Sequence, residues 1–310
     1  MSGPAPEESR TPGTLLSGRD IRELSAAAGI HPSKQRGQNF VTDPNTVRLI
    51  VARAGITADS TVLEIGPGLG SLTLGLLETG AEVVAVELDR GLADLLPATL
   101  AARGIAADRC RVVHQDALTL SELPAVGPSG RTPTVMVANL PYNVATPILL
   151  TLLERFEDLT EALVMVQSEV VDRLSAGPGS RTYGAPSAKA AWYGRVTRAG
   201  EVSRQVFWPV PNVDSSLVQI VRHAQPLGST ADRTATFAVI DAAFAQRRKT
   251  LRAALRSWAG GAERAGAILA AAGIDPSRRG ETLTIHEFRA VGRAARALDP
   301  TPPSADQEDP

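Results

Sequence analysis

The chain has 310 residues, a single cysteine and four histidines, and its formal net charge is −1. This length allows one large domain or two. Because Cys110 stands alone, an internal disulfide and a cysteine-ligated zinc site are excluded, and the scattered histidines do not support a metal site. The apolar runs are too short to cross a bilayer and the start lacks the features of a secretory signal. We therefore expect a soluble, cytoplasmic protein without membrane contact or bound metal.

The charge is distributed unevenly along the chain. Residues 59–139 hold five Lys or Arg against ten Asp or Glu, whereas residues 189–258 hold eleven against four. An acidic part suits a small ligand, and a basic part suits a polyanion such as RNA. A solvated, arginine-rich surface explains the charge alone equally well.

The first half of the chain predicts an α/β fold. Pro and Glu are frequent up to about residue 13, which indicates a disordered leader. Asp43 before Pro44 is a typical helix start, and apolar residues then recur at helical spacing over 44–54. Short apolar runs separated by helical stretches follow at 61–65, 82–87, 111–114, 134–139 and 162–167. Such runs indicate a doubly wound, mostly parallel sheet whose ligands lie beyond the carboxyl ends of the strands.

The second half changes character after about residue 192. A last alternating strand is predicted over 215–222, and helices follow it. The apolar faces of these helices are Phe237, Ile240 and Phe244, then Leu251, Ala254, Leu255 and Trp258, then Ile268 and Leu269. We therefore expect a leader over 1–30, an α/β domain over 31–228, a small all-helical domain over 229–297 and a disordered tail over 298–310.

Three glycines follow the first predicted strand, in Glu64-Ile65-Gly66-Pro67-Gly68-Leu69-Gly70. Glycines at this place allow a tight turn and a close approach of backbone N–H groups to a ligand. Glu87 stands 21 positions after Gly66, at the end of the next strand, where a carboxylate accepts hydrogen bonds from both ribose hydroxyls. Asp116 follows the third strand and is a candidate acceptor for an adenine amino group. The loop and Glu87 fit a dinucleotide as well as S-adenosylmethionine, and they leave the cofactor open.

The fourth predicted strand ends in Asn139-Leu140-Pro141-Tyr142. An adenine amine is a poor nucleophile because its lone pair is delocalised into the ring. The side-chain oxygen of Asn139 and the backbone carbonyl of Leu140 would accept both N–H protons and direct the lone pair at a methyl donor. Tyr142 would stack on a base drawn out of its helix. A dehydrogenase has no use for this motif, which favours S-adenosylmethionine, although the same residues also form an ordinary turn after a strand.

Residues 34–297 resemble the KsgA/RsmA family of ribosomal RNA adenine dimethyltransferases, which dimethylate two adjacent adenosines near the 3′ end of small-subunit (16S) rRNA. The resemblance rests on the blocks Gly37-Gln38-Asn39-Phe40-Val41, Glu64–Gly70, Asn139–Tyr142, Phe207–Ser215 and Ala243–Thr250. It implies a Rossmann-like methyltransferase that takes methyl groups from S-adenosylmethionine. It further implies that the substrate is the RNA of a pre-30S particle and that the product is N6,N6-dimethyladenosine.

The resemblance also implies the positions of the site residues. Cofactor contacts would fall on Asn39, Val41, Gly66, Glu87, Asp116 and Asn139, of which the first two come from the resemblance alone. Phe207 matches an aromatic residue that lies against the target base in related adenine methyltransferases. We therefore expect the base to lie between Tyr142 and Phe207, with a core role for Phe207 as the alternative. The chain departs from the family at two positions: Arg36 replaces a residue that is usually apolar, and Val41 replaces a residue that is commonly leucine. Neither change disturbs a proposed side-chain role.

A group of basic residues in the predicted helical domain suits RNA. Arg248, Arg252 and Arg256 recur every four residues and would form a basic stripe on one helix, with Arg247 and Lys249 beside it. Such a stripe suits the phosphates of an RNA backbone. A solvated helix face is the alternative.

Three other functions remain open. A resistance methyltransferase that acts on large-subunit rRNA would share the fold and the catalytic motif, but the 244–250 block and the Pro-rich segment after Phe207 favour the small-subunit enzyme. An RNA-binding assembly or transcription factor that has lost catalysis is disfavoured because every cofactor and catalytic position holds a chemically competent residue. A DNA adenine methyltransferase is distinguished by its preference for DNA over RNA. No pattern typical of a dimer is visible, and we expect a monomer.

Overall fold

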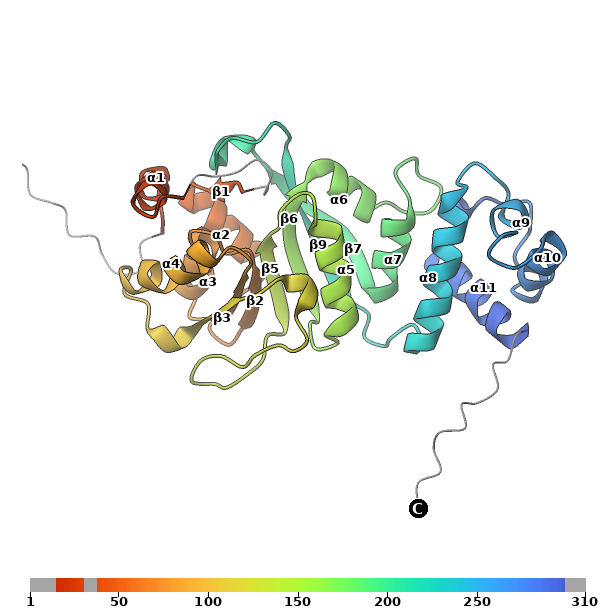
Figure 1. The fold of residues 1–310 in the computed structure, drawn as a ribbon, viewed down its shortest axis with the longest axis horizontal. Coiled ribbons are helices and arrows are strands. Elements are labelled where there is room, and N and C mark those ends of the chain that lie inside the picture. Colours follow the sequence, from red (N-terminus) through yellow and green to blue (C-terminus); the bar gives the residue numbers. More distant parts are fainter. Residues whose placement is uncertain (1–14, 31–37, 299–310) are drawn as a thin grey trace, which may run out of the picture. The chain divides into compact units, whose positions relative to one another are not determined.

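The computed structural model describes residues 15–30 and 38–298, arranged in two compact units (Figure 1). The sheet unit extends to Val171 and also contains Thr197–Arg222, and the helical unit comprises Asp172–Val196 together with the chain from His223 onward. The disorder predicted up to residue 13 falls outside the described residues, as does the tail after Leu298. Among the described residues no helix is long and apolar enough to cross a membrane.

A seven-stranded sheet lies at the centre of the sheet unit, with the strand order β4-β3-β2-β5-β6-β9-β7. Strands β2 to β6 pair in parallel, and β9 runs antiparallel to β6. The strands are β2 (Thr61–Ile65), β3 (Glu82–Glu87), β4 (Cys110–His114), β5 (Val135–Asn139), β6 (Glu161–Gln167), β7 (Gly194–Val202) and β9 (Ser215–Arg222), of which β7 begins in the helical unit. The five parallel strands lie within one residue of the predicted ranges. The predicted doubly wound class is confirmed.

The chain order of the strands places the ligand-binding edge. From β2 the chain moves outward through β3 to β4 and then returns to the other side of β2 to form β5. The strand order therefore reverses between β2 and β5, and in open α/β sheets ligands bind outside the carboxyl ends of the strands at such a point. The glycine loop follows β2 and Asn139 ends β5. Both motifs consequently lie at the reversal.

Helices cover this sheet, and their starts follow the sequence. They are α1 (Gly18–Ala27), α2 (Pro44–Arg53), α3 (Ser71–Glu78), α4 (Arg90–Ala101), α5 (Ala145–Arg155) and α6 (Ser168–Leu174), of which α6 ends in the helical unit. The side chain of Asp43 accepts hydrogen bonds from the first turn of α2, which caps the helix as the sequence predicted. Helix α3 begins directly after the glycine loop and packs against α2.

Helix α1 belongs to the segment predicted as a leader, but it is folded onto the core. Ser17 and Asp20 form a capping box at its start, and Ile21 on its inner face is fully buried. Asp20 also pairs with Arg103 at 3.3 Å, and both side chains are buried. An unpaired charge at this depth is costly, so the pair secures α1 to the end of α4.

A two-stranded sheet joins two segments that are far apart in the sequence. Phe40–Val41 (β1) pairs antiparallel with Phe207–Trp208 (β8), with Val41 opposite Phe207. The rings of Phe40 and Trp208 stack with their centroids 6.4 Å apart. Thr42 strengthens the junction because its N–H and hydroxyl both donate to the carbonyl of Val206. Local periodicity does not predict this pairing.

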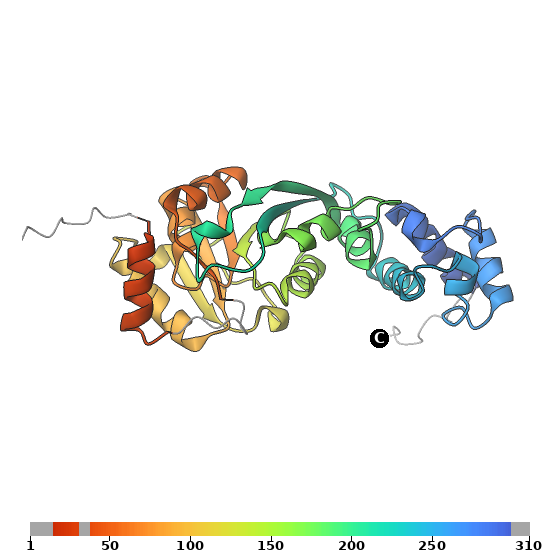
Figure 2. The ribbon, with the colours of Figure 1, turned by 90° about the horizontal axis from the view of Figure 1, so that it is seen from above.

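The helical unit contains more of the chain than the predicted 229–297. Its helices are α7 (Ala185–Tyr193), α8 (Thr230–Ala245), α9 (Leu251–Ala254), α10 (Ala262–Ala271) and α11 (Ile285–Leu298), and the last four gather at the blue end of the chain in Figure 2. Residues 172–196 join them because their aromatic rings pack on α8. Trp192 and Tyr193 each contact Phe237 with ring centroids 6.1 Å apart. The hydroxyl of Tyr183 donates to the carbonyl of Leu283 at 2.8 Å.

Asp232 connects the two longest helices of this unit. Its carboxylate, near the start of α8, lies 3.1 Å from Arg293 and 2.7 Å from Arg296 on α11. Burial opposes ionisation of this carboxyl, but Arg293, a backbone hydrogen bond at Ser229 and the charge of Arg296 together hold the pKa of Asp232 below its ordinary value. The ion pairs therefore fix α11 along α8.

Gly75 is required by the contact between α2 and α3. A Cβ added at Gly75 would collide with Cγ1 of Val47, a stiff β-branched side chain that is 2% exposed. We expect Gly75→Ala to lower the free energy of unfolding by about 1–3 kcal/mol, despite the better helix propensity of alanine. Urea denaturation measures this. Gly266→Ala is the control, since its Cβ would meet Arg252 Nε at an ordinary 3.7 Å. Stabilisation by Gly75→Ala would show that α2 and α3 are not in close contact.

Candidate active site

A cavity of about 720 Å³ opens at the strand reversal of the sheet unit. Four segments line it: residues 38–41, the glycine loop with the start of α3, residues 87–92 after β3, and the motif that begins at Asn139. His114 at the end of β4 completes the wall. All of these segments belong to the sheet unit, and each follows or faces the carboxyl end of a parallel strand. The site is thus built where the fold class predicts it.

The glycine loop depends on backbone conformations that other residues rarely adopt. Gly66, Gly68 and Gly70 have φ angles of +69°, +58° and +93°. Gly68 also makes a close approach, because a Cβ at this position would lie 2.8 Å from the Phe40 ring. Phe40 and the loop consequently form one continuous wall of the cavity.

Glu87 lies at the end of β3 and is 7% exposed. Its Oε2 accepts the Gly68 N–H at 3.1 Å, and its Oε1 accepts the Asp89 N–H at 2.9 Å. Burial raises the pKa of Glu87, and these two N–H groups oppose the rise. A carboxylate has about four acceptor sites, so each oxygen retains capacity for a further donor. The predicted pair of ribose hydroxyls fits this remaining capacity.

Glu64 is a second buried carboxyl in the cavity wall, with 1% exposure. Burial raises its pKa to about 8, the charge of Glu87 adds to the rise, and Thr73 opposes it. Ser71, at the start of α3, is also buried, and its Oγ has no hydrogen-bond partner among the described residues. A buried hydroxyl without a partner is rare. Glu64 and Ser71 therefore leave hydrogen-bonding atoms in the cavity wall that no described residue uses.

The amide of Asn139 has a determined orientation. Its Nδ2 donates to the backbone carbonyl of Asn39 at 3.0 Å. Because a carbonyl only accepts, the nitrogen must face Asn39, and Oδ1 is left as an acceptor on the other side. The following residue, Leu140, is held by its N–H, which donates to Met165 on β6 at 3.1 Å. The motif therefore presents an amide oxygen from a rigid strand end.

The two predicted stacking residues have different surroundings. Tyr142 is partly buried, and its hydroxyl lies 2.7 Å from the hydroxyl of Ser215. Phe207 is 2% exposed and belongs to the hydrophobic core, and it does not line the cavity. A base could reach the Phe207 ring only after the side chains that cover it had moved. Tyr142 does not line the cavity either, so the structure brings neither predicted stacking residue into the cavity wall.

Asp116 has a local structural role. Its Oδ1 accepts the Leu118 N–H at 2.9 Å and caps the short turn Ala117–Thr119. It does not line the cavity, whereas His114 two residues earlier does. The sequence-based prediction also missed Leu88, which is 67% exposed and follows Glu87 in the cavity wall. Its place directly after a strand end was the signal that could have identified it.

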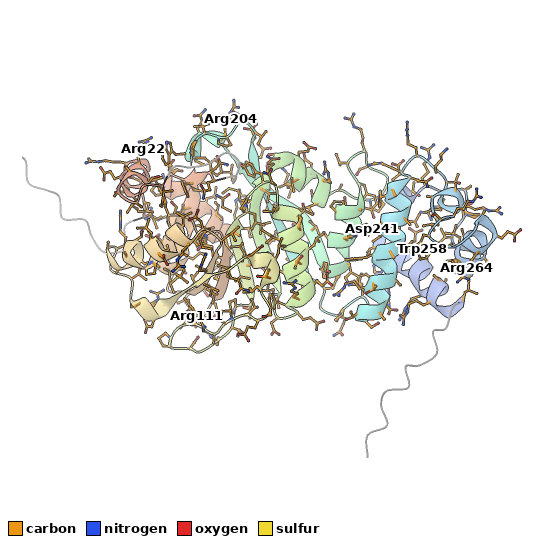
Figure 3. All side chains as sticks on the ribbon, viewed as in Figure 1. Arg22, Arg111, Arg204, Asp241, Trp258 and Arg264 are labelled. Atoms are coloured by element: carbon orange, nitrogen blue, oxygen red, sulfur yellow. The ribbon has the colours of Figure 1, made fainter. Side chains whose placement is uncertain are left out.

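The predicted basic stripe is not one helix, which corrects the sequence-based expectation. Gln246 ends α8 with φ −126° and ψ 51°, and a separate four-residue helix α9 starts after Thr250. At the start of α9, the N–H of Leu251 donates to the carbonyl of Arg278 and that of Arg252 to the carbonyl of Pro276, so both bond to another loop and not to the preceding turn. Trp258, labelled in Figure 3, lies beyond the end of α9 and is only partly buried.

The five basic residues are therefore not equivalent. Arg247 donates to Glu281 at 2.8 Å and to the Arg181 carbonyl at 2.7 Å, so it holds two loops together. Arg252 donates to the Ala262 carbonyl at 3.3 Å. The remaining three, Arg248, Lys249 and Arg256, are exposed, and the last two line a hollow of about 590 Å³. Within the described residues no cluster of His, Cys, Asp and Glu is suited to a metal ion.

Known proteins resemble this chain in sequence and in fold. Residues 31–291 match the family described as ribosomal RNA adenine dimethylase. The chain is 60% identical over 284 residues to ribosomal RNA small subunit methyltransferase A of Streptomyces griseus, covering 91% of this chain and 96% of that protein. The protein of the same name from Streptomyces avermitilis is 58% identical over 292 residues, or 94% and 95% of the two chains. A dimethyladenosine transferase structure from Plasmodium falciparum has the same fold, with a TM-score of 0.69 and 21% identity over 81% of this chain and 95% of that one.

The buried carboxyl of Glu64 makes the stability of the protein depend on pH. Its folded-state pKa of about 8 lies above the ordinary value of 4.5. Between these values the folded protein keeps a proton that the unfolded chain releases, so the free energy of unfolding should fall as pH rises. Glu64→Gln cannot ionise, and we expect it to reduce this fall.

Chemical denaturation of both proteins at about pH 5 and about pH 8 measures the effect. The difference in stability between the two pH values should be smaller in the variant. An equal difference in the two proteins would mean that Glu64 is already ionised in the folded state.

Proposed function

The chain belongs to the ribosomal RNA adenine dimethylase family, and from this premise we propose that it methylates N6 of two adjacent adenosines near the 3′ end of small-subunit (16S) rRNA. The product would be N6,N6-dimethyladenosine, formed during assembly of the small subunit. The observation that carries this proposal is the orientation of Asn139, whose Oδ1 is left as an acceptor beside a cavity of cofactor size.

The cavity residues fit S-adenosylmethionine, which supplies a methyl group activated by a sulfonium. Glu87 retains acceptor capacity for ribose hydroxyls after binding its two backbone N–H groups. The positive-φ glycines let the backbone approach a ligand closely, and Ser71 offers a buried hydroxyl without a partner among the described residues. Of the predicted cofactor contacts, Asn39, Val41, Gly66, Glu87 and Asn139 line the cavity. Asp116 would have to reach the adenine from outside this wall.

Asn139 and Leu140 would activate the adenine by accepting its protons. Two acceptors at N6, the Asn139 Oδ1 and the Leu140 carbonyl, draw the nitrogen toward tetrahedral geometry and direct its lone pair at the methyl group. The developing positive charge on the nitrogen would be stabilised by the same acceptors, of which the Asn139 Oδ1 is already oriented before the reaction. Catalysis of this kind depends mainly on alignment. A rigid strand end meets that requirement better than a mobile loop.

Tyr142 would hold the extruded base by stacking. Pro141 and Asn143, on either side of it, line the cavity, whereas Tyr142 itself does not, so stacking would require the base to extend past this wall. A flipped base is commonly bound between aromatic or apolar side chains. Phe207 remains the proposed second face of this sandwich, and its burial implies that base binding would expose it.

The charges of the two units favour RNA as the partner. The described residues of the helical unit include sixteen Arg or Lys and seven Asp or Glu, whereas those of the sheet unit include thirteen and twenty. A polyanion is therefore attracted to the helical unit and repelled from most of the sheet unit. We propose that the helical unit contacts ribosomal RNA in a pre-30S particle. The names of the curated relatives favour the small subunit over large-subunit RNA as the substrate.

Asn139→Ala removes the proposed acceptor. We expect methyl transfer from labelled S-adenosylmethionine to undermethylated small subunits to fall by at least about a hundredfold, as for other preorganised electrostatic groups. Binding of small-subunit RNA should change less than about threefold, because the reacting amine is the only part of the RNA that Asn139 would contact. Filter binding and label incorporation measure the two quantities. Near-normal turnover in this variant would remove the role of Asn139.

Arg248 and Arg247 form a matched pair for RNA binding. Arg248→Ala should weaken RNA affinity and reduce the slope of log affinity against log salt by about one, because one phosphate contact is lost. Arg247→Ala should instead lower the melting temperature, since it breaks the Glu281 ion pair and the bond to Arg181. Affinity at several salt concentrations and thermal unfolding separate the two. If Arg247→Ala weakened RNA affinity and Arg248→Ala only lowered the melting temperature, Arg248 would not be the RNA contact.

A further inference from the structure

Strand β9 begins with two buried serines whose hydroxyls have different partners. Ser215 is 1% exposed, and its Oγ lies 2.7 Å from the hydroxyl of Tyr142. Ser216 is 0% exposed, and its Oγ lies 2.7 Å from that of Ser168 and accepts Arg198 Nη2 at 2.9 Å. Successive side chains of a strand point to opposite faces of the sheet. The Ser215 hydroxyl consequently contacts the catalytic motif, whereas the Ser216 hydroxyl contacts Ser168 and Arg198.

The antiparallel direction of β9 explains how Ser215 reaches the catalytic motif. Ser215 pairs with Gln167, the last residue of β6, and therefore lies at the carboxyl edge of the parallel strands. Strand β6 also pairs with β5, where Met165 is opposite Asn139. The start of β9 is thus brought to the edge at which the Asn139–Tyr142 motif leaves the sheet, although 73 residues separate Tyr142 from Ser215.

The hydroxyl bond constrains the Tyr142 ring at its far end. A tyrosine ring turns about two side-chain bonds, and stacking requires one ring plane. The backbone of Tyr142 is held by the turn after Pro141, because the Val144 N–H donates to the Pro141 carbonyl at 3.2 Å. The bond to Ser215 holds the opposite end of the side chain. With both ends fixed, the long axis of the ring is set before a base arrives. Because a phenol hydroxyl bonds preferentially in the plane of its ring, the contact with Ser215 also favours one ring plane.

We propose that Ser215 is a positioning residue that holds the Tyr142 ring in the orientation needed to stack on the target adenine. This inference rests on the proposed function, because it assigns Ser215 a role through a residue of the same site. Ser215 touches neither substrate nor cofactor in this role. Ser216, one residue along the chain, has no such role, because its hydroxyl is engaged with Ser168 and Arg198.

A double-mutant cycle of Ser215→Ala and Tyr142→Phe tests the proposal in the full-length protein. Each single variant loses the same hydroxyl bond while the aromatic ring remains. We expect each to lower the single-turnover rate of methyl transfer to undermethylated small subunits by about three- to tenfold. The double variant should be no slower than the slower single variant. The dissociation constants for S-adenosylmethionine and for the RNA should stay unchanged.

Ser216→Ala is the control, since it removes a neighbouring buried hydroxyl that bonds to Ser168 and Arg198 instead of Tyr142. It should lower the melting temperature at least as much as Ser215→Ala does and leave the single-turnover rate unchanged. Fluorescence of RNA that carries 2-aminopurine at the target position gives a second readout. Ser215→Ala should weaken the quenching caused by stacking on Tyr142, and Ser216→Ala should not.

Three results would overturn the inference. One is a normal single-turnover rate for Ser215→Ala, and another is a double variant whose loss is the product of the two single losses. The third is a loss of rate in Ser216→Ala as large as that in Ser215→Ala, which would indicate general destabilisation. Failure of the proposed function is distinguishable from these, because the unmodified protein would then leave the small-subunit adenosines unmethylated.

Discussion

One hydrogen bond, from Asn139 Nδ2 to the carbonyl of Asn39, decides which atom of the amide is offered to a substrate. If the amide were reversed, Nδ2 would be offered to an amine that has only protons to donate, and the site could not activate adenine. The bond joins residues 100 positions apart, so it requires both the end of β5 and the segment before β1 to be in place. The active site is consequently a product of the whole sheet unit.

The rest of the sheet unit holds these two segments together. The pairing of β1 with β8 secures residues 40–41, and the contact of Phe40 with Gly68 joins them to the glycine loop. That loop is connected in turn to Glu87 through the Gly68 N–H. Residues from four separate parts of the sequence thus form one wall of the cavity, which presents polar acceptors and lets the backbone of the glycine loop come close to a ligand. The helical unit adds a surplus of positive charge, which the sheet unit lacks.

Sequence patterns predicted the features that depend on neighbouring residues. The parallel strands follow from unbroken apolar runs, the start of α2 from Asp43 and Pro44, and the cofactor loop from its glycines. Features that depend on distant partners were missed or wrong. The basic stripe was expected on one helix, but α8 ends before it, the next helix begins with bonds to the carbonyls of Arg278 and Pro276, and Arg247 is used in an ion pair. Similarly, the docking of α1, the β1–β8 pairing and the Tyr142–Ser215 bond have no local pattern.

The identity of the methylated nucleoside tests the central claim most directly. Undermethylated small subunits and, separately, large-subunit RNA would be incubated with the protein and labelled S-adenosylmethionine, digested to nucleosides and measured by mass spectrometry. The account predicts N6,N6-dimethyladenosine confined to the small-subunit RNA. Label in large-subunit RNA would contradict the proposed substrate, and RNA binding without any methyl transfer would contradict the catalytic role of the Asn139 motif.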